Sequence, residues 1–319
     1  MPKIESKYNP PLLFKNGHIA TIYAGAFRKV NGLVQKRERL QLSDGDFLDL
    51  DWSHSPSTTK KVVVLLHGLE GNAQRHYILG SAKLLNQNGF DACAVNFRSC
   101  SGTPNTLYRS YHSGATEDLS EVISHLLHHK DYQQIYLMGF SLGGNLAMKY
   151  LGENNILNQK IKGAVGVSIP CDLANACEEL LKPKNMLYAQ KFKKNLIAKL
   201  RVKQSMFPDC VSVDQINNII TLKDFDDVYT SRAHGFKNAN QYYAMCSCRQ
   251  FLEKINVPSL IINAKNDSFL GALCFPFEEA LNNQNLLLET PQYGGHVGFW
   301  GQNNISYVEG RALQFFNSL

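Results

Sequence analysis

The stretch that decides the fold is QIYLMGFSLGGNLAMKYL, residues 134–151. Its first half is an apolar run typical of a buried strand, and its second half has the apolar spacing of a helix. Between them stands Gly139-Phe140-Ser141-Leu142-Gly143, and a strand-to-helix turn this tight needs small residues two positions before and after its centre. The pattern predicts that Ser141 is a nucleophile whose hydroxyl is exposed at the turn. The alternative is a serine that only caps the helix between two turn glycines.

Outward from this stretch, apolar runs alternate with helical patterns from residue 62 onward, which is typical of βαβ units and a mostly parallel sheet. We expect strands over residues 62–66, 92–96, 134–138, 163–168, 259–263 and 286–289. Helices are expected over residues 77–87, 115–129, 142–151, 275–282 and 307–317. A DG turn at residues 44–45 joins strand-like runs at 34–42 and 47–51, which predicts an antiparallel hairpin at the sheet edge. The sequence therefore predicts an α/β fold with helices flanking the sheet.

The alternation of strands and helices is interrupted once. Residues 170–257 carry helical patterns and no convincing strand, and a structureless loop of that length would be unusual. We therefore expect a mostly helical cap inserted into an α/β core made of residues 34–169 and 258–319. Residues 1–33 are apolar in patches, and we expect an extension that packs along the body or the cap.

A second motif lies at the end of the first core strand, in VVVLLHGLEG, residues 62–71. An HG pair in this position is where a loop donates a backbone N–H group to an oxyanion. We assign the two donors to the N–H groups of Leu69 and Leu142, the second being the residue after the nucleophile. His67 is expected to brace the loop rather than transfer protons. Three glycines are expected to support these turns: Gly68, Gly139 and Gly143.

The candidate acid and base follow in chain order. After the strand at 259–263 comes the turn AKND, in which Asp267 is the only carboxylate. One strand later, glycines on both sides leave His296 room to reach Ser141, and no other histidine follows His234. This order predicts that Ser141 attacks a carbonyl, His296 moves the proton and Asp267 orients the imidazole. A helix-capping role for Asp267 is the alternative. The chemistry needs no metal and no organic cofactor.

The connection from residue 98 to residue 118 is polar and rich in His, Tyr, Ser and Gly. Buried polar groups need hydrogen-bond partners, so the loop can be a support for the surroundings of the nucleophile. Alternatively, Arg98 or His112 lies near the site and supports the residues that act there.

These residues together carry a resemblance. The chain resembles the bacterial YheT-like and eukaryotic abhydrolase-domain esterases and lipases of the α/β-hydrolase superfamily. The similarity implies an α/β-hydrolase fold and hydrolysis of carboxylic esters, with lipid-like or short-to-medium acyl chains. The matching stretches are residues 16–18, 44–46, 48–49, 51–52, 67–71, 76–77, 96–98, 100–102, 104–105, 111–114, 116–118, 139–145, 229, 234–236, 242–243 and 294–299.

Two departures from the family pattern bear on this interpretation. Many relatives carry two aspartates and a proline in the acid loop, where this chain has Asn266-Asp267-Ser268. Asp267 keeps the spacing of the acid, so its assignment survives. Eukaryotic relatives often carry an N-terminal membrane anchor, and we expect instead a soluble, bacterial-type member.

Composition narrows the possible partners. The 319 residues are 44% hydrophobic with a net charge of +6, as in an ordinary globular protein, and no nucleic-acid motif accompanies the charge. No secretory pattern, membrane-length apolar run or zinc-site cysteine spacing is visible, so we expect a cytoplasmic protein with reduced thiols. The oligomeric state is not indicated.

One basic stretch is expected to be a solvated helix face or, alternatively, a weak peripheral contact with anionic lipid: Lys191, Lys193, Lys194, Lys199, Arg201 and Lys203.

The leading hypothesis is an esterase or lipase that acts on a small apolar acyl ester. An acyltransferase would use the same acyl-enzyme, and the sequence does not separate the two. A non-catalytic binding protein on this scaffold would have a damaged set of residues, whereas all three are present here. A dehalogenase or epoxide hydrolase would need an aspartate in place of Ser141. Apolar residues of the cap suggest an acyl-accepting wall or core: Met186, Leu187, Phe192, Met206 and Phe207.

Overall fold

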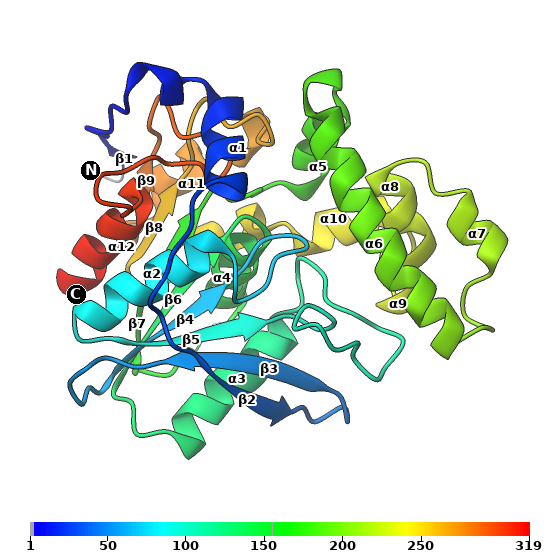
Figure 1. Cartoon of the computed structure of the whole chain (residues 1–319), viewed down its shortest axis with the longest axis horizontal. Helices are drawn as coiled ribbons and strands as arrows, with labels where there is room; N and C mark the ends of the chain where they lie inside the picture. The colour runs from blue at the N-terminus through cyan, green and yellow to red at the C-terminus, as the bar shows by residue number, and fades with distance from the viewer. Residues whose placement is uncertain (1–2, 155) are drawn as a thin grey trace.

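The computed structural model describes residues 3–154 and 156–319; residues 1 and 2 of the expected extension and residue 155 of the expected core lie outside this description. Nine strands in the described part form one sheet, in the order β1-β9-β8-β7-β6-β4-β5-β3-β2 (Figure 1). All neighbours run parallel except β2–β3 and β3–β5. The predicted α/β fold with a mostly parallel sheet is confirmed. The strands are β1 (Lys3–Ile4), β2 (Lys36–Gln41), β3 (Phe47–Ser53), β4 (Lys61–Leu66), β5 (Asp91–Asn96), β6 (Gln134–Phe140), β7 (Ile161–Val167), β8 (Ser259–Ile262) and β9 (Leu286–Glu289).

The expected elements of the core form within two residues of their expected bounds, including the antiparallel hairpin of β2 and β3 at one edge of the sheet. Long apolar runs and regular helical spacing carry this information locally. The helices and turns outside the segment between β7 and β8 are η1 (Leu12–Lys15), α1 (Gly17–Ala26), α2 (His76–Gln87), α3 (Thr116–His129), α4 (Leu142–Glu153), η5 (Ala272–Cys274), α11 (Phe277–Asn282) and α12 (Tyr307–Asn317).

Helices cover both faces of the sheet because its strands are apolar on both sides. In β4, the side chains of Val62, Val64 and Leu66 pack in one cluster with α3 and α4. Val63 and Leu65 alternate with them and pack with α2 and α12 in a second cluster. All five side chains are fully buried, so β4 is the centre of a three-layer core with the period of two that a strand imposes.

The N-terminal segment lies along the body of the molecule. β1 adds a parallel strand beside β9, which the sequence did not predict because two residues form no recognisable apolar pattern. α1 begins after Asn16, whose side chain accepts the N–H groups of His18 and Ile19. Beyond α1, the guanidinium of Arg28 makes two hydrogen bonds of 2.7 Å to the buried carboxylate of Glu309 in α12. The start of the chain is thus tied to its last helix.

Between β7 and β8 the chain leaves the sheet and forms helices and turns, seen at the right of Figure 1. We call residues 170–257 the cap insertion. Its elements pack on one another through an apolar cluster that includes Leu196 and Leu200 of α6 and Ile216 of α7. No helix in the described part of the chain is long and apolar enough to cross a membrane. The elements are α5 (Leu173–Leu181), η2 (Pro183–Asn185), α6 (Met186–Met206), α7 (Val213–Asn217), α8 (Leu222–Phe225), η3 (Asp226–Thr230), α9 (Ser231–Ala233), α10 (Ala239–Cys246) and η4 (Cys248–Lys254).

Substitution of two helical glycines tests how closely the cap insertion packs on the core. Gly→Ala inside a helix usually stabilises a protein by about 0.5–1 kcal/mol. A Cβ at Gly310 in α12 meets nothing within 4 Å, so Gly310→Ala should raise the free energy of unfolding by that amount. A Cβ at Gly152 in α4 collides with the carbonyl of Phe251 in η4, so Gly152→Ala should lower it by about 1–3 kcal/mol. Urea unfolding checks the opposite signs, and two stabilised variants would contradict this packing.

Candidate active site

Ser141 occupies the turn between β6 and α4. Its backbone has φ 52° and ψ −120°, a strained combination for a residue with a side chain. The turn is held because the Ser141 N–H donates to the carbonyl of Val167 in β7 at 2.8 Å. The Ser141 hydroxyl makes no capping hydrogen bond to α4. The structure therefore does not support the alternative in which this serine only caps the helix.

Neighbouring glycines let two loops close on each other. A Cβ on Gly139 would collide with the carbonyl of Gly143, and a Cβ on Gly143 would collide with the carbonyl of Leu66 at the end of β4. A Cβ on Gly68 would stand 3.1 Å from the Cβ of Ser141. The turn after β6 is thus too tight for a side chain at Gly139, and at Gly143 it packs backbone against backbone on the end of β4. A side chain at Gly68 would be crowded by Ser141.

The structure brings Ser141, Asp267 and His296 together. His296 Nε2 is 2.9 Å from the hydroxyl oxygen of Ser141, and His296 Nδ1 is 2.9 Å from a carboxylate oxygen of Asp267. The other carboxylate oxygen accepts the N–H of Phe269 at 3.0 Å, and Asp267 is only 3% exposed. The ring of Phe269 stacks on the imidazole with 4.2 Å between centroids. The hydroxyl, imidazole and carboxylate therefore form one hydrogen-bonded chain, which we call the relay.

The loop that carries His296 is held by residues from distant parts of the chain. The His296 N–H donates to the hydroxyl of Thr21 in α1 at 2.8 Å, and the next N–H donates to the hydroxyl of Ser168 at 3.0 Å. The preceding N–H donates to the side-chain oxygen of Asn266 at 3.0 Å. The Asn266 amide donates in turn to the carbonyl of Lys15 at 2.9 Å. Sequence reasoning missed Thr21 and Ser168 because isolated hydroxyls carry no local signal.

Leu69 and Leu142 both line the cavity that Ser141 and His296 also line. In the described part of the chain, neither backbone N–H donates to a loop carbonyl or to a side chain. Leu142 is the first residue of α4, so its N–H lies at the positive end of the helix. Two unsatisfied donors beside a nucleophile can stabilise a developing oxyanion.

His67 is enclosed entirely by the protein. One ring nitrogen contacts the carbonyl of Gly68 at 2.8 Å, and the other accepts the N–H of Phe97 at 3.2 Å. Burial lowers the pKa of His67 to about 3, so the ring is neutral at physiological pH. With both nitrogens engaged, the ring braces the loop that carries Leu69.

A cavity of about 140 Å³ lies beside Ser141 and His296. The five residues suggested from the sequence as an acyl wall or core do not line it, and three of them point outward: Leu187 is 81% exposed, and Met186 and Met206 are each 43% exposed. The suggestion of a cavity wall was wrong, whereas the core alternative holds for Phe192, which packs against the apolar cluster of the cap insertion. α6 carries apolar residues around much of its circumference, and the sequence did not show which face turns inward. The apolar wall comes instead from Leu173, Ala176, Leu180, Leu196, Leu200, Leu222 and Phe225.

Known proteins are similar to this chain in sequence and in fold. Residues 61–209 match the family model described as the α/β-hydrolase fold. The chain is 35% identical over 302 residues to the putative esterase YheT of Escherichia coli K12, which covers 93% of this chain and 88% of that protein. The chain belongs to the YheT-like α/β hydrolases. Phospholipase ABHD3 of Bos taurus is 30% identical over 278 residues, which cover 84% of this chain and 67% of that protein.

The resemblance inferred from the motifs is therefore confirmed. Among solved structures, the Pyrococcus furiosus esterase Pf2001 has a TM-score of 0.59 to this α/β hydrolase and 17% sequence identity. The match covers 91% of this chain and 98% of that chain. At this identity the likeness shows the fold, and the predicted α/β-hydrolase fold is confirmed.

Within residues 3–154 and 156–319, no group of three or more His, Cys, Asp or Glu side chains is arranged to hold a metal ion. The eight cysteines of this α/β hydrolase are free. Burial raises the pKa of Cys100 and of Cys177 to about 11, so these two thiols stay protonated at neutral pH. The cytoplasmic location of the protein stays a prediction.

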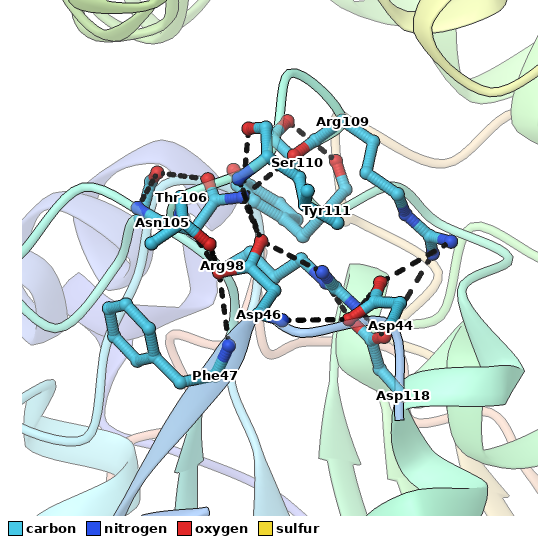
Figure 2. A network of polar contacts seen from close by, with 12 residues as sticks. Asp44, Asp46, Phe47, Arg98, Asn105, Thr106, Arg109, Ser110, Tyr111 and Asp118 are labelled. Atoms are coloured by element: carbon cyan, nitrogen blue, oxygen red, sulfur yellow. Dashed lines mark hydrogen bonds and ion pairs between the residues drawn. The ribbon is translucent and has the colours of Figure 1, made fainter. Parts of the chain in front are cut away.

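Arg98 lies behind the cavity of the hydrolase and does not line it. Figure 2 shows its guanidinium among three carboxylates, with ion pairs of 2.6 Å to Asp118 and 2.9 Å to both Asp44 and Asp46. Asp44 and Asp46 belong to the turn between β2 and β3, whereas Asp118 lies in the first turn of α3. Arg98 therefore joins the hairpin to the helix and supports the loop between them, which is the first of the two interpretations of this stretch.

Asp46 fastens the loop that follows Arg98. Its carboxylate accepts hydrogen bonds from the Asn105 amide at 2.5 Å and from the Thr106 N–H at 2.9 Å (Figure 2). It also accepts the N–H of Leu107 at 3.3 Å. Burial alone would raise the pKa of Asp46, but these hydrogen bonds lower it to about 2. The carboxylate thus stays ionised beside the Arg98 guanidinium.

His112, the other candidate brace, does line the cavity. Its Nδ1 accepts the N–H of Gly114 at 3.1 Å, and its ring packs against His234 with 4.3 Å between centroids. Burial lowers the pKa of His112 to about 3, so the ring is neutral. His112 shapes the cavity wall and makes no hydrogen bond to the relay among the described residues.

Removal of the Arg98 guanidinium should destabilise the hydrolase strongly. Arg98→Met leaves buried carboxylates without their cation, and we expect the free energy of unfolding to fall by about 3–5 kcal/mol. Lys182→Met is the control, since the Lys182 side chain is half exposed and its pair with Glu179 should contribute less than about 0.5 kcal/mol. Urea denaturation of both variants measures the difference, and equal losses would contradict the described role of Arg98.

Proposed function

We propose that this chain is a serine hydrolase that cleaves carboxylic esters of small acyl groups through an acyl-enzyme on Ser141. Membership of the YheT-like α/β hydrolases, whose relatives include proteins named esterase and phospholipase, supports an ester hydrolase. The observation that carries the proposal is the pair of 2.9 Å contacts that link Ser141 to His296 and His296 to Asp267, beside an apolar cavity.

In the first half-reaction, the Ser141 hydroxyl oxygen attacks the ester carbonyl carbon while His296 Nε2 accepts the hydroxyl proton. The N–H groups of Leu69 and Leu142 donate to the negative oxygen of the tetrahedral intermediate, each supplying about 3–4 kcal/mol. Asp267 holds Nδ1 and stabilises the charged imidazole. His296 then gives its proton to the leaving alcohol as the C–O bond breaks, which leaves the acyl-enzyme.

Water completes the cycle by the same route. His296 accepts a proton from water as the water oxygen attacks the acyl carbonyl, and the second intermediate collapses to return that proton to Ser141 and release the carboxylic acid. An alcohol in place of water would make the chain an acyltransferase. The relay serves both reactions, so the partition of the acyl-enzyme between water and an added alcohol distinguishes them.

The size of the cavity supports a short acyl chain. A closed apolar cavity of about 150 Å³ accommodates a group the size of benzene. The cavity beside Ser141 is partly open and has a volume of about 140 Å³, so we propose acyl groups of about four to six carbons. Longer chains would have to displace the leucines of the cap insertion.

Covalent labelling tests the role of the nucleophile. A fluorophosphonate should label the wild type and leave Ser141→Ala unlabelled, because only an activated hydroxyl displaces the fluoride. Hydrolysis of p-nitrophenyl butyrate should fall about 10⁶-fold in Ser141→Ala and about 10⁴-fold in Asp267→Asn. Ser124→Ala, on the exposed surface of α3, is the control and should keep full labelling and turnover. Labelling that persists in Ser141→Ala would contradict the proposal.

Chain-length preference tests the cavity. We expect the wild type to have a higher kcat/KM for the butyrate than for the decanoate p-nitrophenyl ester. Leu200→Ala enlarges the cavity and should shift that ratio about tenfold toward the decanoate. Leu126→Ala is a matched control, because Leu126 is as deeply buried as Leu200 but packs elsewhere; both variants should lose about 2–5 kcal/mol of stability. An unchanged ratio in Leu200→Ala would place the acyl group outside this cavity.

A further inference from the structure

α6 of the cap insertion does not present all its cations to water. Lys191 and Lys194 are exposed, whereas Lys203 is 3% exposed and Lys199 reaches the core. The interpretation of the basic stretch as one solvated helix face is therefore wrong for Lys199 and Lys203. These two residues are four positions apart and share one side of the helix. Lys203 donates to carbonyls of the core loop at residues 105–107.

Lys199 forms an ion pair between the cap insertion and the core. Its ammonium donates to the carboxylate of Glu70 at 2.9 Å and lies 3.2 Å from the sulfur of Cys100. The Glu70 side chain is 4% exposed and the Lys199 side chain is 32% exposed, so the carboxylate is shielded from water while the lysine remains partly accessible. Burial alone would lower the pKa of Lys199, but Cys100 and Glu70 raise it above its ordinary value, and the ammonium stays charged.

Glu70 follows directly after Leu69, the candidate oxyanion donor. Its φ of 54° lies in the left-handed region, which residues with a side chain rarely adopt, so this conformation has to be held by contacts. The Glu70 N–H donates to the hydroxyl of Tyr111 at 3.0 Å, and that hydroxyl donates back to the Glu70 carboxylate at 2.7 Å. The Glu70 carbonyl accepts the guanidinium of Arg75 at 2.7 Å.

The two neighbours of Leu69 are therefore both anchored. On the other side, the N–H of Gly68 donates to the hydroxyl of Tyr77 at 3.1 Å. Gly68, Tyr77 and Tyr111 belong to the core, as does Arg75. Among the described contacts that fix Glu70, those from Tyr111 and Arg75 come from the core, and the contact from Lys199 comes from the cap insertion.

We propose that Lys199 is a positioning residue for the oxyanion hole. Through Glu70 it fixes the loop so that the Leu69 N–H points to the substrate carbonyl. The oxyanion hole therefore stabilises the oxyanion fully only when α6 packs on the core. Leu196 and Leu200 flank Lys199 on α6 and line the cavity, so an acyl group packed on them seats the same helical turn. The inference rests on the proposed function.

Lys199→Met tests the inference because methionine keeps most of the aliphatic chain and removes the ammonium. We expect kcat for p-nitrophenyl butyrate to fall about 10- to 100-fold, approaching the loss of one oxyanion donor. KM should change less than about threefold, since an interaction used in the transition state is removed. Lys199→Arg keeps the charge and should lose less. Lys193→Met is the matched control on α6; its ammonium reaches the carbonyl of Ile220, and kcat should not change.

A double variant tests whether Lys199 acts through Glu70. Glu70→Gln keeps an acceptor for Tyr111 but loses the ion pair, and it should lower kcat as Lys199→Met does. Adding Lys199→Met to Glu70→Gln should then lower kcat less than about twofold further. Losses that multiply would overturn the proposal, because they would mean that Lys199 contributes separately as a cavity wall.

An inhibitor that forms an oxyanion gives an independent measurement. Binding of a butyl trifluoromethyl ketone, which forms a hemiketal oxyanion on the serine, should weaken in Lys199→Met by the same factor as kcat. Binding of the corresponding fluorinated alcohol, which forms no oxyanion, should not change. Equal weakening of both ligands would overturn the proposal, since it would indicate a general loss of binding.

The outcomes separate the two proposals. A wild type that hydrolyses no ester, or a Ser141→Ala variant with full activity, would remove the proposed function and this inference with it. An active wild type with an unchanged Lys199→Met would overturn this inference alone. If circular dichroism shows that Lys199→Met does not fold, Glu70→Gln decides: unchanged kcat in that variant would overturn the role of the ion pair.

Discussion

The site depends on one strained turn, in which Ser141 adopts φ 52° between a parallel strand and a helix. The residue itself does not favour this conformation. It persists because β6 is hydrogen-bonded between β4 and β7, and α4 packs on the same sheet. The turn directs the hydroxyl to the space that the first N–H groups of α4 also face. The imidazole of His296 and the N–H groups of Leu69 and Leu142 lie around that hydroxyl.

Parallel strands gather the remaining groups, since their carboxyl ends meet at one edge of the sheet. The loops that follow β4, β8 and β9 carry Leu69, Asp267 and His296. The sheet places these loops near one another, but it does not orient them. Contacts between distant segments orient them. Thr21 of α1 contacts the histidine loop, and Lys199 of α6 contacts Glu70 in the loop after β4.

Sequence reasoning is most informative where the pattern is local, as in the strands and helices of the core. Ser141, Asp267 and His296 follow apolar strands in turns with few competing polar residues, and the structure brings their side chains within hydrogen-bond distance. It failed where the outcome depends on which side of a helix packs. The sequence suggested a wall or core position for Leu187, which is exposed, and a solvated position for Lys199, which pairs with Glu70. β1 exists because β9 offers an open edge to pair with. Such choices are made by tertiary packing and are absent from any short window of sequence.

The hydrogen bond from His296 to Thr21 joins segments 275 residues apart. A ribosome delivers α1 and the turn at Ser141 well before the loop of His296. Under the proposed roles, a nascent chain therefore displays the nucleophile before the base that would activate it. The imidazole later docks on a helix that was synthesised much earlier, so the proposed chemistry becomes possible only once the histidine loop has been made.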